Sequence, residues 1–170
     1  MAAVRFQAEH QLHGSVQAVA DLLLDPAFHQ HLALPDLALP EVIGQDIDGD
    51  EATLRLRYEY AGQLDPIARR LLGHRKLTWL QELRLNRADG SGRLSFAADA
   101  NPKQLRGDAR VRLAADSDRG DGDVRTVRRI DGQLIVKVPL VGGQAERRII
   151  PGLLRRLDVE AAALNQQLRK

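Results

Sequence analysis

Most of this 170-residue chain consists of segments in which apolar and polar residues alternate, and one long helical pattern ends it. The first segment sets Val4, Phe6 and Leu12 on one side and Arg5 and Glu9 on the other. Alternation with a period of two is typical of a strand that has one face toward solvent. Further strands are expected over residues 41–47, 52–60, 77–85, 93–100, 105–113 and 124–138. Because short turn-forming stretches separate many of them, the pattern predicts a seven-stranded antiparallel sheet.

Short helices are predicted at two places between these strands. Ser15 offers an N-cap for a helix that ends before Pro26, and a second short helix follows over residues 26–32. Asp65 and Pro66 predict another helix, over residues 65–72, after the third strand. With the C-terminal helix, the expected element order is β-α-α-β-β-α-β-β-β-β-α.

The last element is predicted to be a long amphipathic helix from residue 144 to the end of the chain. Its apolar residues recur at steps of three and four: Ile149, Leu153, Leu157, Ala161, Leu164 and Leu168. Glu160 is placed off this apolar line. Pro151 lies in the first turns of the helix and predicts either a kink or a later start.

This element order indicates a curved sheet around the last helix. An antiparallel sheet with one apolar face has to bury that face, and only the C-terminal helix is long enough to cover seven strands. A helix about 10 Å in diameter does not fill the whole concave side of a curled sheet, so we expect a gap lined by apolar side chains. The length of the chain suits one core, and we expect residues 1–170 to form a single α+β domain.

Composition excludes several classes of protein. The absence of cysteine excludes a disulfide framework and a thiolate metal site. No apolar run approaches the roughly 20 residues that span a bilayer, and the N-terminus lacks the apolar core of a secretory signal. We therefore expect a cytoplasmic protein that is not integral to a membrane. The net charge of +2 and the 4% aromatic content argue against nucleic-acid binding.

The segment Val136-Lys137-Val138-Pro139-Leu140-Val141-Gly142-Gly143, between the last strand and the last helix, resembles the signature of the DUF2505 family. That family belongs to the START-like superfamily, also called SRPBCC. The resemblance implies a helix-grip fold and a superfamily that binds lipids, polyketides and other apolar molecules between sheet and helix. It implies no catalytic residue at any position of this chain.

The predicted ligand site consists of side chains expected on the inner face of the sheet, on the short helix and on the C-terminal helix. They are Phe6, His10, Leu56, Tyr58, Tyr60, Leu71, Trp79, Leu83, Phe96, Val111, Arg128, Leu153 and Leu157. The alternative is that the same side chains fill a dry core. The tyrosines and Trp79 stand out because each joins a large apolar surface to one polar atom that needs a partner when buried. The helix over residues 65–72 either covers the cavity as a lid or simply packs over the sheet edge.

Two polar residues of this set carry alternative interpretations. His10 is either a core histidine with satisfied hydrogen bonds or a ligand anchor or general base. Arg128 stands where an apolar residue is expected. A bulge near Gly132 is one explanation, and outward exposure of the side chain is another. A third is an arginine that reaches inward and pairs with an anionic head group or within the protein.

No metal site and no cofactor are expected. Asp46, Asp48 and Asp50 begin like a calcium loop, but Glu51 occupies the position of the required glycine. On a helix, His29 and His31 would point about 200° apart and could not bind one metal ion.

These observations lead to three hypotheses of function. The first is non-catalytic binding or transport of a small apolar molecule, lipid or polyketide-like, in the cavity. The second is an enzyme of the polyketide aromatase or cyclase type, which the lack of an inward acid or base pair disfavours. The third is a protein-interaction module with a filled core and an exposed apolar patch, whose protein partner is unknown.

Overall fold

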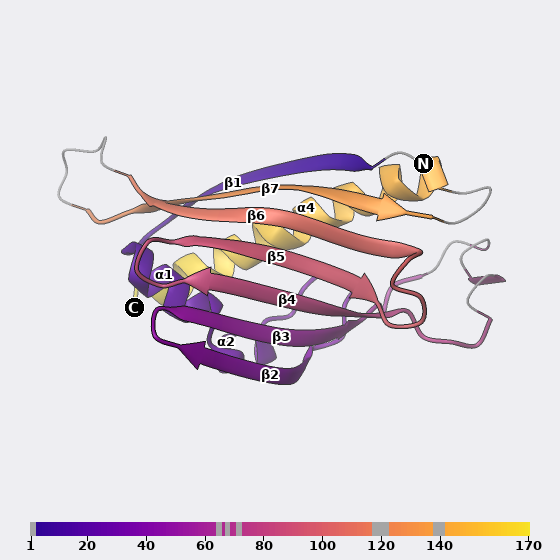
Figure 1. The fold of residues 1–170 in the computed structure, drawn as a ribbon, viewed down its shortest axis with the longest axis horizontal. Helices are drawn as coiled ribbons and strands as arrows, with labels where there is room; N and C mark the ends of the chain where they lie inside the picture. Colours follow the sequence, from indigo (N-terminus) through magenta and orange to yellow (C-terminus); the bar gives the residue numbers. More distant parts are fainter. Residues whose placement is uncertain (1–2, 64–65, 67–68, 71–72, 117–122, 138–141) are drawn as a thin grey trace.

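Seven antiparallel strands form one curved sheet, and the C-terminal helix α4 crosses its concave side (Figure 1). The computed structural model describes residues 3–63, 66, 69–70, 73–116, 123–137 and 142–170. The order of the strands in the sheet is β1-β7-β6-β5-β4-β3-β2. Their bounds are Val4–Leu12 for β1, Glu41–Asp48 for β2, Glu51–Glu59 for β3, Thr78–Asn86 for β4, Ser91–Ala98 for β5, Leu105–Ala115 for β6 and Thr126–Val136 for β7. The predicted α+β fold with a seven-stranded antiparallel sheet is confirmed.

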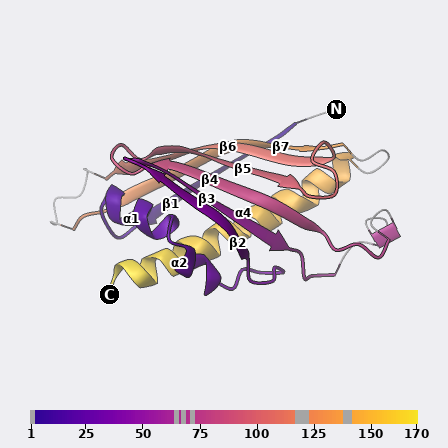
Figure 2. The same ribbon diagram turned by 60° about the horizontal axis from the view of Figure 1, so that its bottom comes forward.

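Helices α1 (Val16–Leu23) and α2 (Pro26–Gln30) follow β1 and close one end of the concave side. The Ser15 hydroxyl accepts a hydrogen bond from the backbone N–H of Ala18, and Asp25 caps α2 in the same way. The buried face of α1 consists of Val19, Ala20 and Leu23. The C-terminal half of α4 lies beside these two helices (Figure 2).

Helix α4 spans Gly142–Leu168 and approaches β1 and β7 most closely. It begins before Pro151 and includes it, so the alternative of a later start is wrong. Leu157, Ala161 and Leu164 are buried against the sheet and α1. No helix among the described residues is long and apolar enough to cross a membrane.

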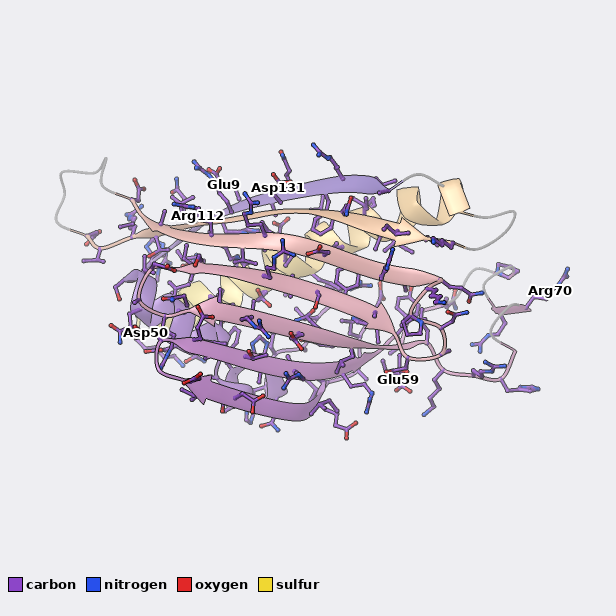
Figure 3. The ribbon with its side chains drawn as sticks, in the orientation of Figure 1. Glu9, Asp50, Glu59, Arg70, Arg112 and Asp131 are labelled. Carbon is purple, nitrogen blue, oxygen red and sulfur yellow. The ribbon has the colours of Figure 1, made fainter. Side chains whose placement is uncertain are left out.

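The two faces of the sheet differ in chemistry, as the alternation predicts. The outer face carries charged residues, including the exposed Glu9, Arg112 and Asp131 (Figure 3). Many of these charges pair across strands; Arg129 bonds to Glu9 at 3.0 Å, for example. The inner face carries the core, and this difference fixes which side chains can reach a molecule between the sheet and α4.

The register between β1 and β7 is unbroken from Val4 opposite Leu134 to Leu12 opposite Thr126. There is therefore no bulge near Gly132, and the first explanation for Arg128 is wrong. The only shift in register along the described strand pairs lies between Val42 and Gly44, at the edge strand β2.

Candidate functional site

Arg128 lies on the inner face of β7, directly opposite His10 of β1 and Leu113 of β6. It is only 2% exposed. Its guanidinium forms an ion pair with the carboxylate of Glu160, which reaches down from α4 and is also buried. A buried guanidinium requires such a counter-ion. The arginine therefore reaches inward and pairs with a carboxylate of the protein itself.

The remaining nitrogens of Arg128 also have partners. Nη2 donates to the backbone oxygen of Leu157 at 3.2 Å. Nε and Nη2 lie 3.4 and 3.2 Å from Nδ1 of His10. Because an arginine nitrogen only donates, Nδ1 of His10 has to be the acceptor. The guanidinium is therefore satisfied by groups of the protein on three sides.

His10 links this buried pair to the surface. With Nδ1 as an acceptor, its Nε2–H donates to Oδ1 of Asp158 at 2.9 Å. Burial lowers the pKa of His10 from its ordinary value, and the nearby Arg128 lowers it further, whereas Asp158 and Glu160 act in the opposite direction. The neutral imidazole therefore suits the position. His10 joins α4 to β1 through a hydrogen bond, which agrees with the interpretation of a core histidine whose hydrogen bonds are satisfied.

Tyr58 and Trp79 form an aromatic pair at another part of the inner face. They lie opposite each other in β3 and β4, with ring centroids 6.0 Å apart and an angle of 26° between the rings. Tyr58 is 3% exposed. Burial raises the pKa of its hydroxyl, and the charge of Glu160 raises it further. Among the described residues, no partner accepts a hydrogen bond from this hydroxyl.

Gln81 adds a further polar group to the same face. It lies directly opposite Leu56 of β3 and Phe96 of β5, and side chains that are opposite each other in a sheet share a face. It is neither fully buried nor fully exposed. Its side-chain amide makes no hydrogen bond with another part of the described chain. An inward amide of this kind can both donate to and accept from a bound molecule.

Packing is tight at one end of the inner face and looser at the other. Near α1, the side chains of Leu12, Leu113 and Leu164 are 0 to 1% exposed. Where β4 begins and β5 ends, Trp79 and Phe96 keep part of their surface accessible, as Leu153 of α4 does. The concave side is therefore sealed toward α1 and less completely covered toward Trp79.

Twelve of the thirteen predicted site residues fall into three groups. The strands place nine of them on the inner face: Phe6, His10, Leu56, Tyr58, Trp79, Leu83, Phe96, Val111 and Arg128. Leu153 and Leu157 of α4 pack against the same core. Leu71 and most of the predicted helix over residues 65–72 lie outside the described residues.

Tyr60, the thirteenth predicted residue, lies directly after the end of β3. Its hydroxyl donates to the backbone oxygen of Gln63 at 3.4 Å. Its ring faces the Arg156 guanidinium, whose carbon lies 6.0 Å from the ring centroid. Its polar atom thus has a partner within the protein.

The expectation that no acid or base pair points inward is wrong. Glu160 is buried beside Arg128, whose guanidinium also contacts His10. The helical spacing contained this signal, because Glu160 follows Leu157 by three residues and precedes Leu164 by four. Gln81 was missed in the same way, although it lies two residues from both Trp79 and Leu83.

The described residues contain no group of three or more potential ligands that could hold a metal ion. His29 and His31 each bond to a separate backbone oxygen, those of Leu23 and Ala27.

Apolar side chains are exposed around the edge strand β2, where Leu39 and Ile47 are each 59% exposed.

Comparisons with known proteins agree with this architecture. The solved Zhui aromatase/cyclase from Streptomyces sp. R1128 is similar with a TM-score of 0.65 and 11% identity, over 99% of this chain and 94% of that chain. Norcoclaurine synthase from Thalictrum flavum, solved with dopamine and hydroxybenzaldehyde, has a TM-score of 0.60 and 15% identity, over 99% of this chain and 87% of that chain. Ara h 8.0201 has a TM-score of 0.62 and 8% identity, over 99% of each chain. At these identities the likeness shows the fold alone, which is the START-like helix-grip fold.

A search of curated proteins found no sequence match. The model of the DUF2505 family, described as a protein of unknown function, matches residues 7–168. Because this match spans nearly the whole chain, the protein belongs to the DUF2505 family.

Proposed function

We propose that this protein binds a small apolar molecule, lipid or polyketide-like, between the concave face of the sheet and α4, without converting it. The observation that carries the proposal is the uneven packing of the inner face. Trp79, Phe96 and Leu153 stay partly accessible although they face the interior, whereas the end near α1 is sealed. A close-packed core would leave little of these three side chains accessible.

The chemistry of these accessible residues suits an apolar ligand. Aromatic and aliphatic side chains line most small-molecule sites, and a few polar groups orient the occupant. Here Trp79, Phe96 and Leu153 offer the apolar surface, and Tyr58 and Gln81 offer polar atoms. The complex of norcoclaurine synthase with dopamine and hydroxybenzaldehyde supports the proposal, because that protein has the same fold and holds small aromatic molecules.

Filling the inner face from within tests this proposal. Ala98 is buried and lies opposite Trp79, whereas its neighbour Ala97 points to the outer face. Substitution of Ala98 by phenylalanine puts a ring where the ligand would lie. With the uncharged fluorescent dye N-phenyl-1-naphthylamine as the probe, we expect Ala98→Phe to weaken binding about tenfold or more.

The matched control is Ala97→Phe, which adds the same ring to the opposite face of the same strand. It should leave the affinity for the dye unchanged. Equal affinities for both variants, or no binding of the dye to the unmodified protein, would count against the proposal.

A second candidate is an enzyme that converts its ligand, and the inward carboxylate of Glu160 favours it. A carboxylate on the inner face is a group that can act as a general acid or base toward a bound molecule. Native mass spectrometry of protein purified from its own host separates the two candidates. A co-purified molecule that stays unchanged on prolonged incubation supports a binder, and its conversion to a new mass supports an enzyme.

A further inference from the structure

The edge strand β2 is open to a further strand, and an acidic pocket lies beside it. We infer that this edge is a docking site for an extended basic segment of another protein, which adds a strand to the sheet and places a lysine or arginine side chain in the pocket. The inference is independent of the proposed function. The pocket includes Ala52, at the start of β3, whereas Trp79 lies opposite Tyr58 near the other end of that strand.

β2 ends the sheet on the side opposite β1 (Figure 1). Its backbone pairs with β3 from Glu41 to Asp48, and among the described residues no other backbone hydrogen bond reaches it. An edge strand turns every second N–H and C=O away from its neighbour, and these groups can pair with another extended segment. β2 therefore offers a row of backbone partners to a further strand.

The side chains of this edge do little to prevent such pairing. Ile43 and Ile47 are 39% and 59% exposed. Protected edge strands commonly carry lysine or proline, and β2 contains neither. The shift in register between Val42 and Gly44 leaves a regular stretch from Gly44 to Asp48. This stretch is long enough for several backbone hydrogen bonds to an added strand.

Helix α2 lies beside β2 (Figure 2). A pocket of about 300 Å³ lies between the strand and the junction of α1 and α2. Its apolar wall includes Leu24, Pro26 and Ile47, and Asp21 and Asp25 add carboxylates. Pockets for small molecules range from about 300 to 1,000 Å³, so this one suits a single long side chain better than a large ligand.

A strand added to β2 would place every second side chain beside this pocket. Ile47 lies opposite the buried Ala52, so its side chain is on the inner face, where it lines the pocket. Residues directly opposite each other in neighbouring strands share a face. The residue of the added strand that is opposite Ile47 therefore projects on the side of the pocket.

The charges around the pocket favour a cation. Arg87 is the only cation that lines it, against Asp21 and Asp25, and it approaches Asp21 only to 3.9 Å. The adjoining hairpin turn adds Asp48 and Asp50, whose carboxylates form no ion pair among the described residues (Figure 3). A lysine or arginine side chain suits this combination, because its apolar stem can pack on the apolar wall while its charged end reaches the carboxylates.

Arg87 gives a second, independent sign of a partner. Its guanidinium donates to the backbone oxygen of Gly49, but its Nε is buried and has no acceptor among the described residues. Buried polar atoms without a hydrogen bond are rare in folded proteins. An acceptor on a docked segment, such as a backbone oxygen, would complete the hydrogen bonds of Arg87.

A second copy of this chain suits the edge less well than a basic segment does. β2 contains three acidic residues, Glu41, Asp46 and Asp48, and no basic one. Antiparallel pairing of two such strands brings acidic side chains together, and like charges opposite each other destabilise a strand pair. The partner strand therefore carries lysine or arginine.

An eight-residue peptide of alternating valine and lysine, blocked at both ends, tests the inference. We expect the unmodified protein to bind this lysine peptide about tenfold or more tightly than a peptide with glutamate in place of lysine. A third peptide keeps the lysines and has proline in place of valine, so it lacks half of the N–H groups needed for strand pairing. It should bind about tenfold more weakly than the lysine peptide. Isothermal titration calorimetry provides the three affinities.

Two matched variants locate the site. Ile47→Lys places a positive charge beside the pocket, and Val124→Lys places the same charge at a residue that is 64% exposed and lies before β7. Because both side chains are exposed, neither change disturbs the core. Ile47→Lys should weaken binding of the lysine peptide about tenfold or more, whereas Val124→Lys should change it less than about twofold.

Several outcomes would overturn the inference: no binding of the lysine peptide, equal affinities for the three peptides, or equal losses in the two variants. A dimer of the unmodified protein that Ile47→Lys dissociates would also overturn it, because the edge would then bind a second copy. Binding of N-phenyl-1-naphthylamine should be the same in Ile47→Lys as in the unmodified protein. A failure at the β2 edge therefore leaves the proposed function intact.

Discussion

The Arg128 guanidinium on β7 and the Glu160 carboxylate on α4 form an ion pair in which the side chains are 2% and 10% exposed. Through Leu157 and His10 the same guanidinium contacts α4 again and β1. One side chain therefore ties the long helix to two neighbouring strands. A buried pair of this kind adds little net stability compared with apolar residues, but the loss of one partner is costly.

The ion pair gives the first prediction. Arg128→Met leaves the Glu160 carboxylate buried without a counter-ion, and we expect the free energy of unfolding to fall by about 3–5 kcal/mol. Replacement of both residues, by Arg128→Met and Glu160→Leu, should cost less than the sum of the two single changes. Urea unfolding of the unmodified protein, the two single variants and the double variant measures the coupling energy between Arg128 and Glu160. Additive losses would show that the two side chains do not act as a pair.

The histidine in this network predicts how stability depends on pH. The pKa of His10 lies below its ordinary value of 6.5, first because of burial and second because of Arg128. The unfolded chain therefore takes up the proton first as the pH falls. The stability that the neutral imidazole contributes is complete above about pH 6.5 and is lost as the pH falls through the lower pKa of the folded state.

His10→Gln removes the titrating imidazole, so a comparison of this variant with the unmodified protein isolates the contribution of His10. The difference in free energy of unfolding between the unmodified protein and His10→Gln should shrink between about pH 7.5 and pH 5. A difference that stays constant or grows toward acid would mean that the folded state favours the protonated imidazole.

The contact between Phe96 and Gly107 predicts the effect of a single methyl group. A Cβ at Gly107 would lie 2.1 Å from the Phe96 ring, so the ring would have to move into the inner face. We expect Gly107→Ala to cost about 1–3 kcal/mol of stability. Gly44→Ala is the control, because a Cβ there meets nothing within 4 Å. Equal unfolding midpoints for the two variants would contradict this packing.

Trp79 predicts an optical signal for binding, since it is the only tryptophan of the chain. It lies on the inner face, stacked on Tyr58, where a ligand would contact it. An apolar probe such as 2-methylnaphthalene should change its emission in a saturable manner. If calorimetry detects binding of the probe but the emission of Trp79 does not change, the probe binds elsewhere.

The strands and the helix order could be predicted from the sequence because the physical cause is local. Alternation over residues 4–12 predicts β1 with the bounds that the structure has, Val4–Leu12. The outer face has to be polar and the inner face apolar, so polar and apolar residues alternate along the strands. The last strand begins at Thr126, two residues after the predicted start, because Val124 is exposed beyond the sheet.

The site could be predicted only in part, because its polar residues come from elements that are distant in the chain. Period and spacing place Gln81 and Glu160 on inward faces, but their polar character argues against burial when each is considered alone. Only the folded structure shows that Arg128 supplies the charge that allows Glu160 to be buried. The packing of α4 against β1 and β7, which brings Glu160 to Arg128, depends on the whole structure.

The most direct test of ligand binding is a crystal structure of the protein grown with 2-naphthol. We predict density for the naphthalene ring beside Trp79, inside the concave face of the sheet. Density for the probe only on the outer surface, with side chains of α4 packed directly against Trp79 and Phe96, would contradict it.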